Sequence, residues 1–402
     1  MPRGIARGVS RGWAIVGALS VTETVSWGVL YYVFAVVLLP MQRELGYSAA
    51  ELTGGFSLGL LVAGMAGIGV GRFLDRRGPR VLMTAGSVAG ALLVVAWSRV
   101  ESLAAFYALW VALGLVMATV LYEPAFTVLA KWFTDAGERR RAMTALTLVA
   151  GLASFIFLPL GQALIDAHGW RDALVILAVV LAVVTVPLHA VVLRQGPASA
   201  DGEPAADTGA VLRSAPFWLL SAGFFLASLA AFAMIVQAIP FLLDRGHGTS
   251  FAAFAVGLMG AAQIPGRFVF ALVADRLPSR SVIPSVFALV ALGIALIVAV
   301  PGTVAVLAGM VVLGMGSGMA ILARATVIAD RYGSAAYGAI AGVAASVTTA
   351  ARAAAPVAAA VWASVVGYEG LLWTLAGLAA VAVLLGAQAE RAHARAPGPS
   401  GG

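Results

Sequence analysis

Long apolar segments recur along the whole 402-residue chain, and they constrain its fold more than any other feature. Each is about 20 residues or longer, which is the length that an α-helix needs to cross the hydrocarbon core of a bilayer. With 61% hydrophobic and 11% charged residues, the chain is far more apolar than water-soluble proteins are. A transmembrane β-barrel would show short segments of alternating hydrophobicity, which this sequence lacks. We therefore expect an all-α membrane protein.

Twelve of these segments are predicted to span the membrane. They cover residues 13–39, 52–74, 79–98, 102–130, 142–166, 171–193, 216–242, 251–274, 281–300, 303–329, 336–363 and 370–388. A polar stretch that contains Pro197 and Pro204 separates the sixth span from the seventh. The expected domains are an N-terminal six-helix bundle over 1–194, a cytoplasmic linker over 195–213, a C-terminal six-helix bundle over 214–390 and a disordered cytoplasmic tail over 391–402.

The basic residues favour one orientation in the membrane. With the N-terminus in the cytoplasm, 18 of the 25 lie on the cytoplasmic side; the other seven are Arg43, Arg99, Arg171 and Arg245 outside and Arg267, Arg324 and Arg352 within spans. The positive-inside rule therefore places both termini in the cytoplasm. We expect a multi-pass protein of a bacterial-type cytoplasmic (inner) membrane. The net charge of +7 follows from these loops and does not indicate a nucleic-acid partner.

A loop between the second and third spans, Gly71 to Arg80, has a second copy 200 residues later. Asp75 to Arg80 and Asp275 to Arg280 share the spacing Asp-Arg-x-x-x-Arg. A solvated loop with positive-inside charges would explain one copy, whereas two copies in register favour a structural latch in a module written twice. The predicted latch residues are Gly71, Asp75, Arg76, Gly78, Arg80, Asp275 and Arg276.

Asp75 needs a partner, because a carboxylate at a helix C-terminus faces the negative end of the helix dipole. The unfavourable interaction is offset if the carboxylate of Asp75 reaches Arg76, Arg77 or the positive N-terminus of a neighbouring helix. Close packing is predicted elsewhere by two pairs with Gly-x-x-x-Gly spacing, which let helix backbones approach in lipid. These pairs are Gly67 with Gly71 and Gly338 with Gly342.

At this point the chain resembles the major facilitator superfamily. The loop Gly71 to Arg80 is similar to the signature of that superfamily between spans two and three, and Asp275-Arg276 is similar to its weaker copy between spans eight and nine. The twelve spans and the central linker match as well. The resemblance implies the major facilitator fold, with two pseudo-symmetric six-helix bundles, and an Asp75 latch that stabilises the outward-open state.

Within that superfamily, the chain is similar to the monocarboxylate and oxalate–formate group. The matching residues are Trp27-Gly28-Val29, Pro40-Met41, Lys131-Trp132-Phe133, Arg139-Arg140-Arg141, Pro159, Gly169-Trp170-Arg171 and Gly266-Arg267. Members hold the substrate carboxylate with the span-eight Arg, with a polar or acidic residue one turn earlier. Here the earlier residue is the amide Gln263, and span one carries Glu23 where the group often has a titratable Lys or Asp.

Five charged residues lie inside predicted spans, where each costs at least about 2.5–3.5 kcal/mol and is a functional candidate. On span eight, Gln263 and Arg267 are four residues apart and share one helical face. The guanidinium offers a fork to a carboxylate. The alternative is that Arg267 snorkels or pairs internally with an acidic side chain. The five are Glu23, Glu123, Arg267, Arg324 and Arg352.

Glu123 lies on span four and Arg324 on span ten. When the 200-residue offset is subtracted from the number of Arg324, the two sequence positions differ by one residue. The resemblance places both spans at the central cavity, so that a Glu123–Arg324 bridge would gate transport. Alternatively, Glu123 is the protonation site, because desolvation disfavours a charged carboxylate, or it packs statically with water. Glu23 is a second candidate for proton coupling; its alternative is a hydrogen bond to Thr22, Thr24 or a neighbouring span.

Tyrosine hydroxyls complete the candidate substrate site. Tyr31, Tyr32 and Tyr122 are candidate donors, although an interfacial or packing role is the commoner one. Tyr122 is preferred, because it precedes Glu123 and Pro124, where a helix irregularity would open the wall. Arg352 could share the anion with Arg267. The predicted substrate-binding residues are therefore Arg267, Gln263, Tyr122, Tyr32 and Arg352.

The sequence indicates a secondary transporter for a small organic anion, in particular a monocarboxylate, coupled to protons and functional as a monomer in the lipid bilayer. Efflux of drugs or metabolites is the alternative within transport. There is no Walker loop, no metal-ligand spacing among the four His, no Cys and no catalytic triad. We therefore expect no enzyme activity, no cofactor, no metal and no nucleic-acid partner.

Overall fold

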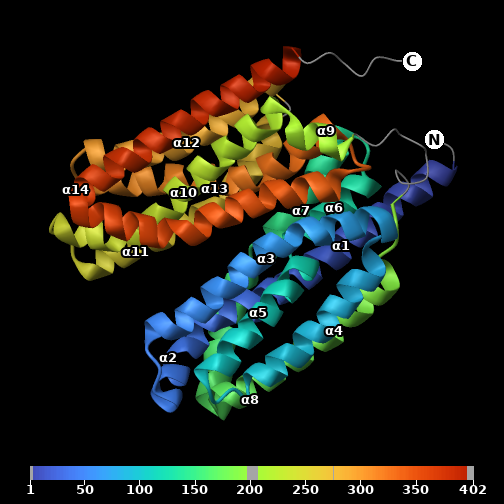
Figure 1. The fold of residues 1–402 in the computed structure, drawn as a ribbon, viewed down its shortest axis with the longest axis horizontal. Coiled ribbons are helices and arrows are strands. Elements are labelled where there is room, and N and C mark those ends of the chain that lie inside the picture. The colour runs from blue at the N-terminus through green and yellow to red at the C-terminus, as the bar shows by residue number, and fades with distance from the viewer. Residues whose placement is uncertain (1–2, 197–206, 275, 396–402) are drawn as a thin grey trace. The chain divides into compact units, whose positions relative to one another are not determined.

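The computed structural model describes residues 3–196, 207–274 and 276–395, and in these ranges the chain is helical without a strand (Figure 1). The elements are α1 (Arg3–Trp27), η1 (Gly28–Tyr32), α2 (Val33–Leu45), α3 (Ala49–Arg77), α4 (Pro79–Trp97), α5 (Leu103–Val120), α6 (Tyr122–Trp132), α7 (Ala136–Ala150), α8 (Ala153–Val192), α9 (Thr208–Arg213), α10 (Ala215–Asp244), α11 (Thr249–Val273), α12 (Ser279–Ala299), α13 (Thr303–Tyr332) and α14 (Tyr337–Arg395).

Ten stretches of the described chain are long and apolar enough to cross a membrane. Two of them are too long for one crossing, and each contains a glycine with a positive φ that interrupts the helix: Gly169 at 79° and Gly367 at 75°. Glycine adopts this conformation without the steric cost of a Cβ. Both breaks fall between spans that the sequence predicts separately, so the helices are consistent with twelve spans.

The chain divides into two compact units. The first comprises Met1–Ala206 and Ile328–Ser346, and the second comprises Asp207–Val327 and Val347–Gly402. At the C-terminus, α14 continues to Arg395, five residues into the segment predicted as a disordered tail. The rest of that tail and linker residues 197–206 lie outside the described residues, and the domain limits stay a prediction.

An aromatic cluster lies in the core of the first unit. The rings of Phe34 and Phe56 stack with centroids 4.4 Å apart, and Trp97 meets Trp110 edge-on at 5.1 Å. The indole N–H of Trp97 donates to the sulfur of Met41 at 3.3 Å, which satisfies a donor that is buried with its ring. This cluster joins α2, α3, α4 and α5.

One very close helix contact recurs at matching positions in the two units. In the first unit, where α3 and α5 lie side by side (Figure 1), a Cβ on Gly114 would overlap the carbonyl oxygen of Gly59. In the second unit, between α11 and α13, a Cβ on Gly314 would overlap the carbonyl oxygen of Met259. The two contacts are related by the 200-residue offset of the repeated loop, which supports the interpretation of one module written twice.

Candidate functional site

Two stretches of irregular backbone in the first unit lie beside candidate site residues. Gly28–Tyr32 form a turn of π-helix, and Leu121 is extended (φ −94°, ψ −164°) between α5 and α6. The second break lies directly before Tyr122, so the predicted irregularity there is confirmed. The π-helix was not predicted. It begins at Gly28, where a Cβ would overlap the ring of Phe157. Such bulges are frequent at functional sites.

Aromatic side chains from both irregular stretches meet at Trp27. Its ring centroid lies 5.0 Å from that of Tyr122, 5.2 Å from Tyr31 and 6.4 Å from Tyr32. Tyr122 also stacks on Phe126 at 5.4 Å. We call Trp27, Tyr31, Tyr32 and Tyr122 the ring cluster. Sequence reasoning chose three tyrosines of this cluster and gave no role to Trp27, which lies at its centre.

Glu23 precedes Trp27 by one helical turn and is fully buried. Neither of its carboxylate oxygens has a hydrogen-bond partner. The polar groups that influence its carboxyl group are the indole N–H of Trp27 and the carboxyl group of Glu123. The hydroxyls of Thr22 and Thr24 donate to backbone carbonyls instead, so the alternative that these threonines satisfy Glu23 is wrong.

The second unit contains a small cavity with two arginines in its wall. Its volume is about 40 Å³. The guanidinium carbon of Arg352 lies 4.9 Å from the ring centroid of Phe232, within the range of a cation–π interaction. Arg324 is buried at 7% exposure. Three hydroxyl side chains line the same cavity, namely Ser228, Ser317 and Thr348. A pocket of this chemistry suits an anion with oxygen acceptors.

Arg267 is not among the residues that line this cavity. Its side chain on α11 is buried at 6% exposure, which argues against snorkelling to the surface. Gln263, one turn earlier, is half-buried. A Cβ on Gly318 of α13 would overlap the backbone carbonyl of Gln263, so this turn of α11 is held at close range by α13. The structure therefore brings Arg324 and Arg352 to one cavity, whose lining does not include Arg267.

Asp75 binds the start of α14. Its carboxylate accepts hydrogen bonds from the backbone N–H groups of Gly338 at 3.2 Å and Ala339 at 2.8 Å. The same carboxylate lies 2.9 Å from the Nζ of Lys131, the single lysine of the chain. Of the partners considered for Asp75, the structure therefore shows the positive N-terminus of a helix, together with a lysine that sequence reasoning did not pair with it.

The two Gly-x-x-x-Gly pairs pack against each other at this contact. Gly71 of α3 meets Gly338 of α14, and Gly67 meets Gly342, with no room for a Cβ on Gly71, Gly338 or Gly342. Ser346 donates to the carbonyl of Gly64 at 2.5 Å and continues the same interface. Close backbone approach along this line holds the first turns of α14 against α3.

The remaining latch residues have different surroundings. Gly78 ends α3 with a φ of 75° and lets Pro79 begin α4. Arg76, Arg80 and Arg276 are exposed. Asp275 lies outside the described residues, so nothing is observed for the second copy of the carboxylate.

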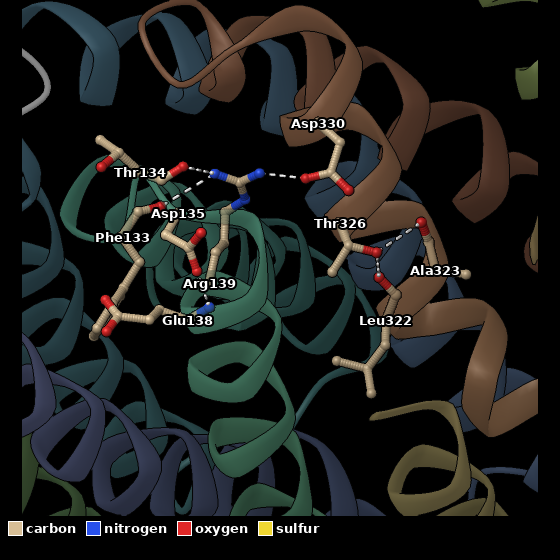
Figure 2. Close-up of polar contacts among 9 residues, drawn as sticks. All are labelled: Phe133, Thr134, Asp135, Glu138, Arg139, Leu322, Ala323, Thr326 and Asp330. Atoms are coloured by element: carbon tan, nitrogen blue, oxygen red, sulfur yellow. Dashed lines mark hydrogen bonds and ion pairs between the residues drawn. The ribbon is translucent and has the colours of Figure 1, made fainter. Parts of the chain in front are cut away.

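A second ion pair joins α7 to the end of α13 (Figure 2). Arg139 donates from Nη2 to the carboxylate of Asp330, and from Nη1 to the carbonyls of Phe133 at 3.1 Å and Thr134 at 3.0 Å. Arg139 is buried. Sequence reasoning missed this pair, whose only signal is an Asp-Arg dipeptide after span ten and an arginine run after span four.

Comparison with known proteins agrees with the helical membrane fold described above. A family model described as Major Facilitator Superfamily matches residues 19–356. The oxalate:formate antiporter of Oxalobacter formigenes is 23% identical over 273 residues, which are 66% of this chain and 64% of the antiporter. Monocarboxylate transporter 13 of Bos taurus is 27% identical over 277 residues, which are 66% of this chain and 62% of that transporter. The matched region thus spans less than two thirds of either relative.

Solved structures show the same fold. The human organic anion transporter MFSD10 has a TM-score of 0.73 at 16% identity, and the likeness covers 93% of this chain and 99% of that chain. At this identity the likeness shows the fold alone.

Proposed function

The chain belongs to the Major Facilitator Superfamily, and from this premise we propose that it moves a small organic anion, a monocarboxylate, across the membrane by alternating access coupled to protons. It is a multi-pass membrane transporter and not an enzyme. The observation that carries the proposal is the set of guanidinium groups within the spans of the second unit, two of which are buried. Arg267 and Arg324 are 6% and 7% exposed, and Arg352 lies at the same cavity as Arg324.

Buried arginines suit this role for a physical reason. A guanidinium offers two parallel N–H donors to one carboxylate and stays charged at any physiological pH. Charge inside a membrane span is expensive, so these residues mark a substrate pathway by default. Arg267 is the proposed anchor, because it shares a helical face with Gln263 and matches the span-eight arginine of the resembled group. Arg352 is the proposed second contact, and Tyr32 and Tyr122 are the proposed hydroxyl donors.

Proton coupling is proposed for a carboxyl group of the first unit. Glu23 is fully buried without a hydrogen-bond partner, and a carboxyl group in such a place gains from binding a proton. Glu123 is the second candidate, and a Glu123–Arg324 gate between residues of different units stays a prediction. In the same mechanism, the Asp75 contact with α14 would favour the outward-open state, and its loss would favour the other.

Uptake by purified protein in proteoliposomes tests the function. We expect a radiolabelled monocarboxylate to accumulate when the pH outside is lower than inside, and to equilibrate only slowly without the gradient. Liposomes that contain Arg267→Ala protein serve as the matched control. Uptake of none of a panel of mono- and dicarboxylates would refute the proposal, and gradient-driven export of apolar compounds would support efflux instead.

The proposed localisation is the cytoplasmic membrane, with both termini and the 195–213 linker in the cytoplasm. The argument is the excess of Arg and Lys on that side. A reporter that is active only in the cytoplasm, inserted in the linker, should give signal. If only a reporter that is active in the periplasm gave signal, the linker would lie outside and the proposed orientation would be wrong.

A further inference from the structure

The ring cluster combines aromatic faces with buried negative charge. Trp27 lies within 6.4 Å of three tyrosine rings, measured between ring centroids. All four side chains are neither fully buried nor fully exposed. Glu23 sits one turn before Trp27, and Glu123 directly follows Tyr122 in the chain.

Glu23 requires a positively charged partner or a proton. It is 0% exposed, and neither oxygen accepts a hydrogen bond. A second carboxyl group, that of Glu123, is among the groups near it. A buried charge without a partner is strongly unfavourable, so Glu23 gains from binding a proton or a positively charged group.

Three kinds of positively charged ligand could neutralise Glu23, and they require different surroundings. A proton neutralises Glu23, as the proposed coupling requires, but it does not explain the four aromatic rings nearby. A small inorganic cation prefers several oxygen ligands, and the described residues contain no group of three or more His, Cys, Asp or Glu that would hold one. An organic ammonium group uses both features, because its charge pairs with a carboxylate and is attracted to the faces of Trp and Tyr rings.

We propose that the ring cluster and Glu23 form a recognition site for an organic ammonium group. Resting on the proposed function, this narrows the substrate class to carboxylates that also carry a positively charged nitrogen, such as amino acids or betaines. Both stretches of irregular backbone in the first unit support it, since η1 carries two rings of the cluster and the break at Leu121 places a third. Irregular backbone is tolerated at membrane depth where it lines a cavity.

Matched probes isolate the charge of the nitrogen. Glycine betaine and 3,3-dimethylbutanoate have the same shape and the same carboxylate, and only the first carries a cationic nitrogen. Choline and 3,3-dimethylbutan-1-ol form the corresponding pair without a carboxylate. Binding of all four to the full-length protein in nanodiscs is measured by calorimetry, together with transport of the two carboxylates in proteoliposomes.

We expect wild-type protein to bind glycine betaine about tenfold more tightly than 3,3-dimethylbutanoate, as a desolvated cation–π contact with a carboxylate requires. In Glu23→Gln and Trp27→Leu proteins this ratio should fall toward one, and Trp27→Phe should keep part of it. Glu101→Gln, the same change at an exposed glutamate, should keep the full ratio. Size-exclusion profiles establish that each variant is folded.

Equal affinities of the two carboxylates in the wild type would overturn the inference. A second contradicting result would be an affinity ratio that stays the same in both Glu23→Gln and Trp27→Leu, while transport by Glu23→Gln no longer responds to a pH gradient. Glu23 would then be a proton site only. If neither carboxylate binds, the proposed function fails, and preference for choline over its neutral isostere then decides this inference on its own.

Discussion

The two units share a close helix contact at matching positions and differ in the polar groups that they bury. In the first, Gly114 meets the backbone of Gly59, and 200 residues later Gly314 meets the backbone of Met259. The first unit holds two glutamates beside the ring cluster, and the second holds three arginines within its spans. The scaffold is therefore repeated, whereas the chemistry is not.

The backbone of the two units also differs, and the difference lies beside the polar residues. Span four is broken at Leu121 between α5 and α6, directly before Tyr122 and Glu123. Its repeat is α13, which runs from Thr303 to Tyr332 without a break. Small residues at helix contacts must be kept in both copies, because the backbones approach too closely for a Cβ. The residues proposed to face a ligand are not under that constraint, and they differ between the two copies.

The largest expected effect comes from the arginines of the second unit. Arg267→Ala should weaken binding of the transported carboxylate by at least about 100-fold, since a charge-assisted double hydrogen bond is lost. Arg267→Lys keeps the charge without the fork and should cost about tenfold. Calorimetric titration measures both.

Arg99→Ala, at an exposed position, is the control and should bind as the wild type does. The cavity that contains Arg324 and Arg352 provides the competing outcome. Wild-type affinity in Arg267→Ala together with lost binding in Arg352→Ala would move the anchor to that cavity.

The shared helix packing predicts equal costs in the two units. Gly114→Ala and Gly314→Ala should each lower the free energy of unfolding by about 1–3 kcal/mol, because the added methyl group meets a backbone carbonyl that cannot turn away. Thermal unfolding in detergent, monitored by light scattering and tryptophan fluorescence, measures the loss.

Gly69→Ala in the first unit and Gly260→Ala in the second are the matched controls, since nothing lies within 4 Å of a Cβ there. Both should be neutral or slightly stabilising. A clear loss at Gly114 with none at Gly314 would show that the repeat of the packing is only apparent.

A smaller and kinetic effect is expected at the start of α14. Asp75→Asn removes the charge that faces the N–H groups of Gly338 and Ala339 and the Nζ of Lys131. Contacts of a carboxylate with a helix N-terminus contribute about 0.3–1 kcal/mol, and up to about 2 kcal/mol when partly buried. Transport should therefore slow several-fold, while the affinity for substrate changes less.

Rates of uptake at saturating substrate, compared with equilibrium binding, separate the two quantities. Lys131→Met should slow transport in the same direction, because it removes the other partner of this carboxylate. Wild-type rates in both well-expressed variants would leave Asp75 with a purely structural role.

The smallest effect is expected at the exposed end of the second ion pair. Asp330 is 33% exposed in its side chain, so Asp330→Asn should lower the free energy of unfolding by no more than about 1 kcal/mol. Arg139→Ala should cost more, because the buried guanidinium also binds the carbonyls of Phe133 and Thr134. Thermal unfolding of the two variants side by side would contradict this view if Asp330→Asn were the more damaging.

The sequence by itself determined the fold class, the membrane spans, the 200-residue repeat and the irregularity before Pro124. These features depend on local properties, namely the length of apolar segments, the spacing of glycines and the missing N–H of proline. The positions of charged residues within spans were equally readable, because a charge in an apolar segment is visible without knowing its neighbours.

Only the tertiary structure decided which of those residues meet. Asp75 binds N–H groups 263 and 264 positions away, and Arg139 binds a carboxylate 191 positions away. The cavity brings Arg324 and Arg352 together without Arg267. Trp27 became the centre of the ring cluster through the π-helix and the break at Leu121. Such contacts depend on how whole helices pack, and no pattern within a single span encodes the partner that packing brings to it.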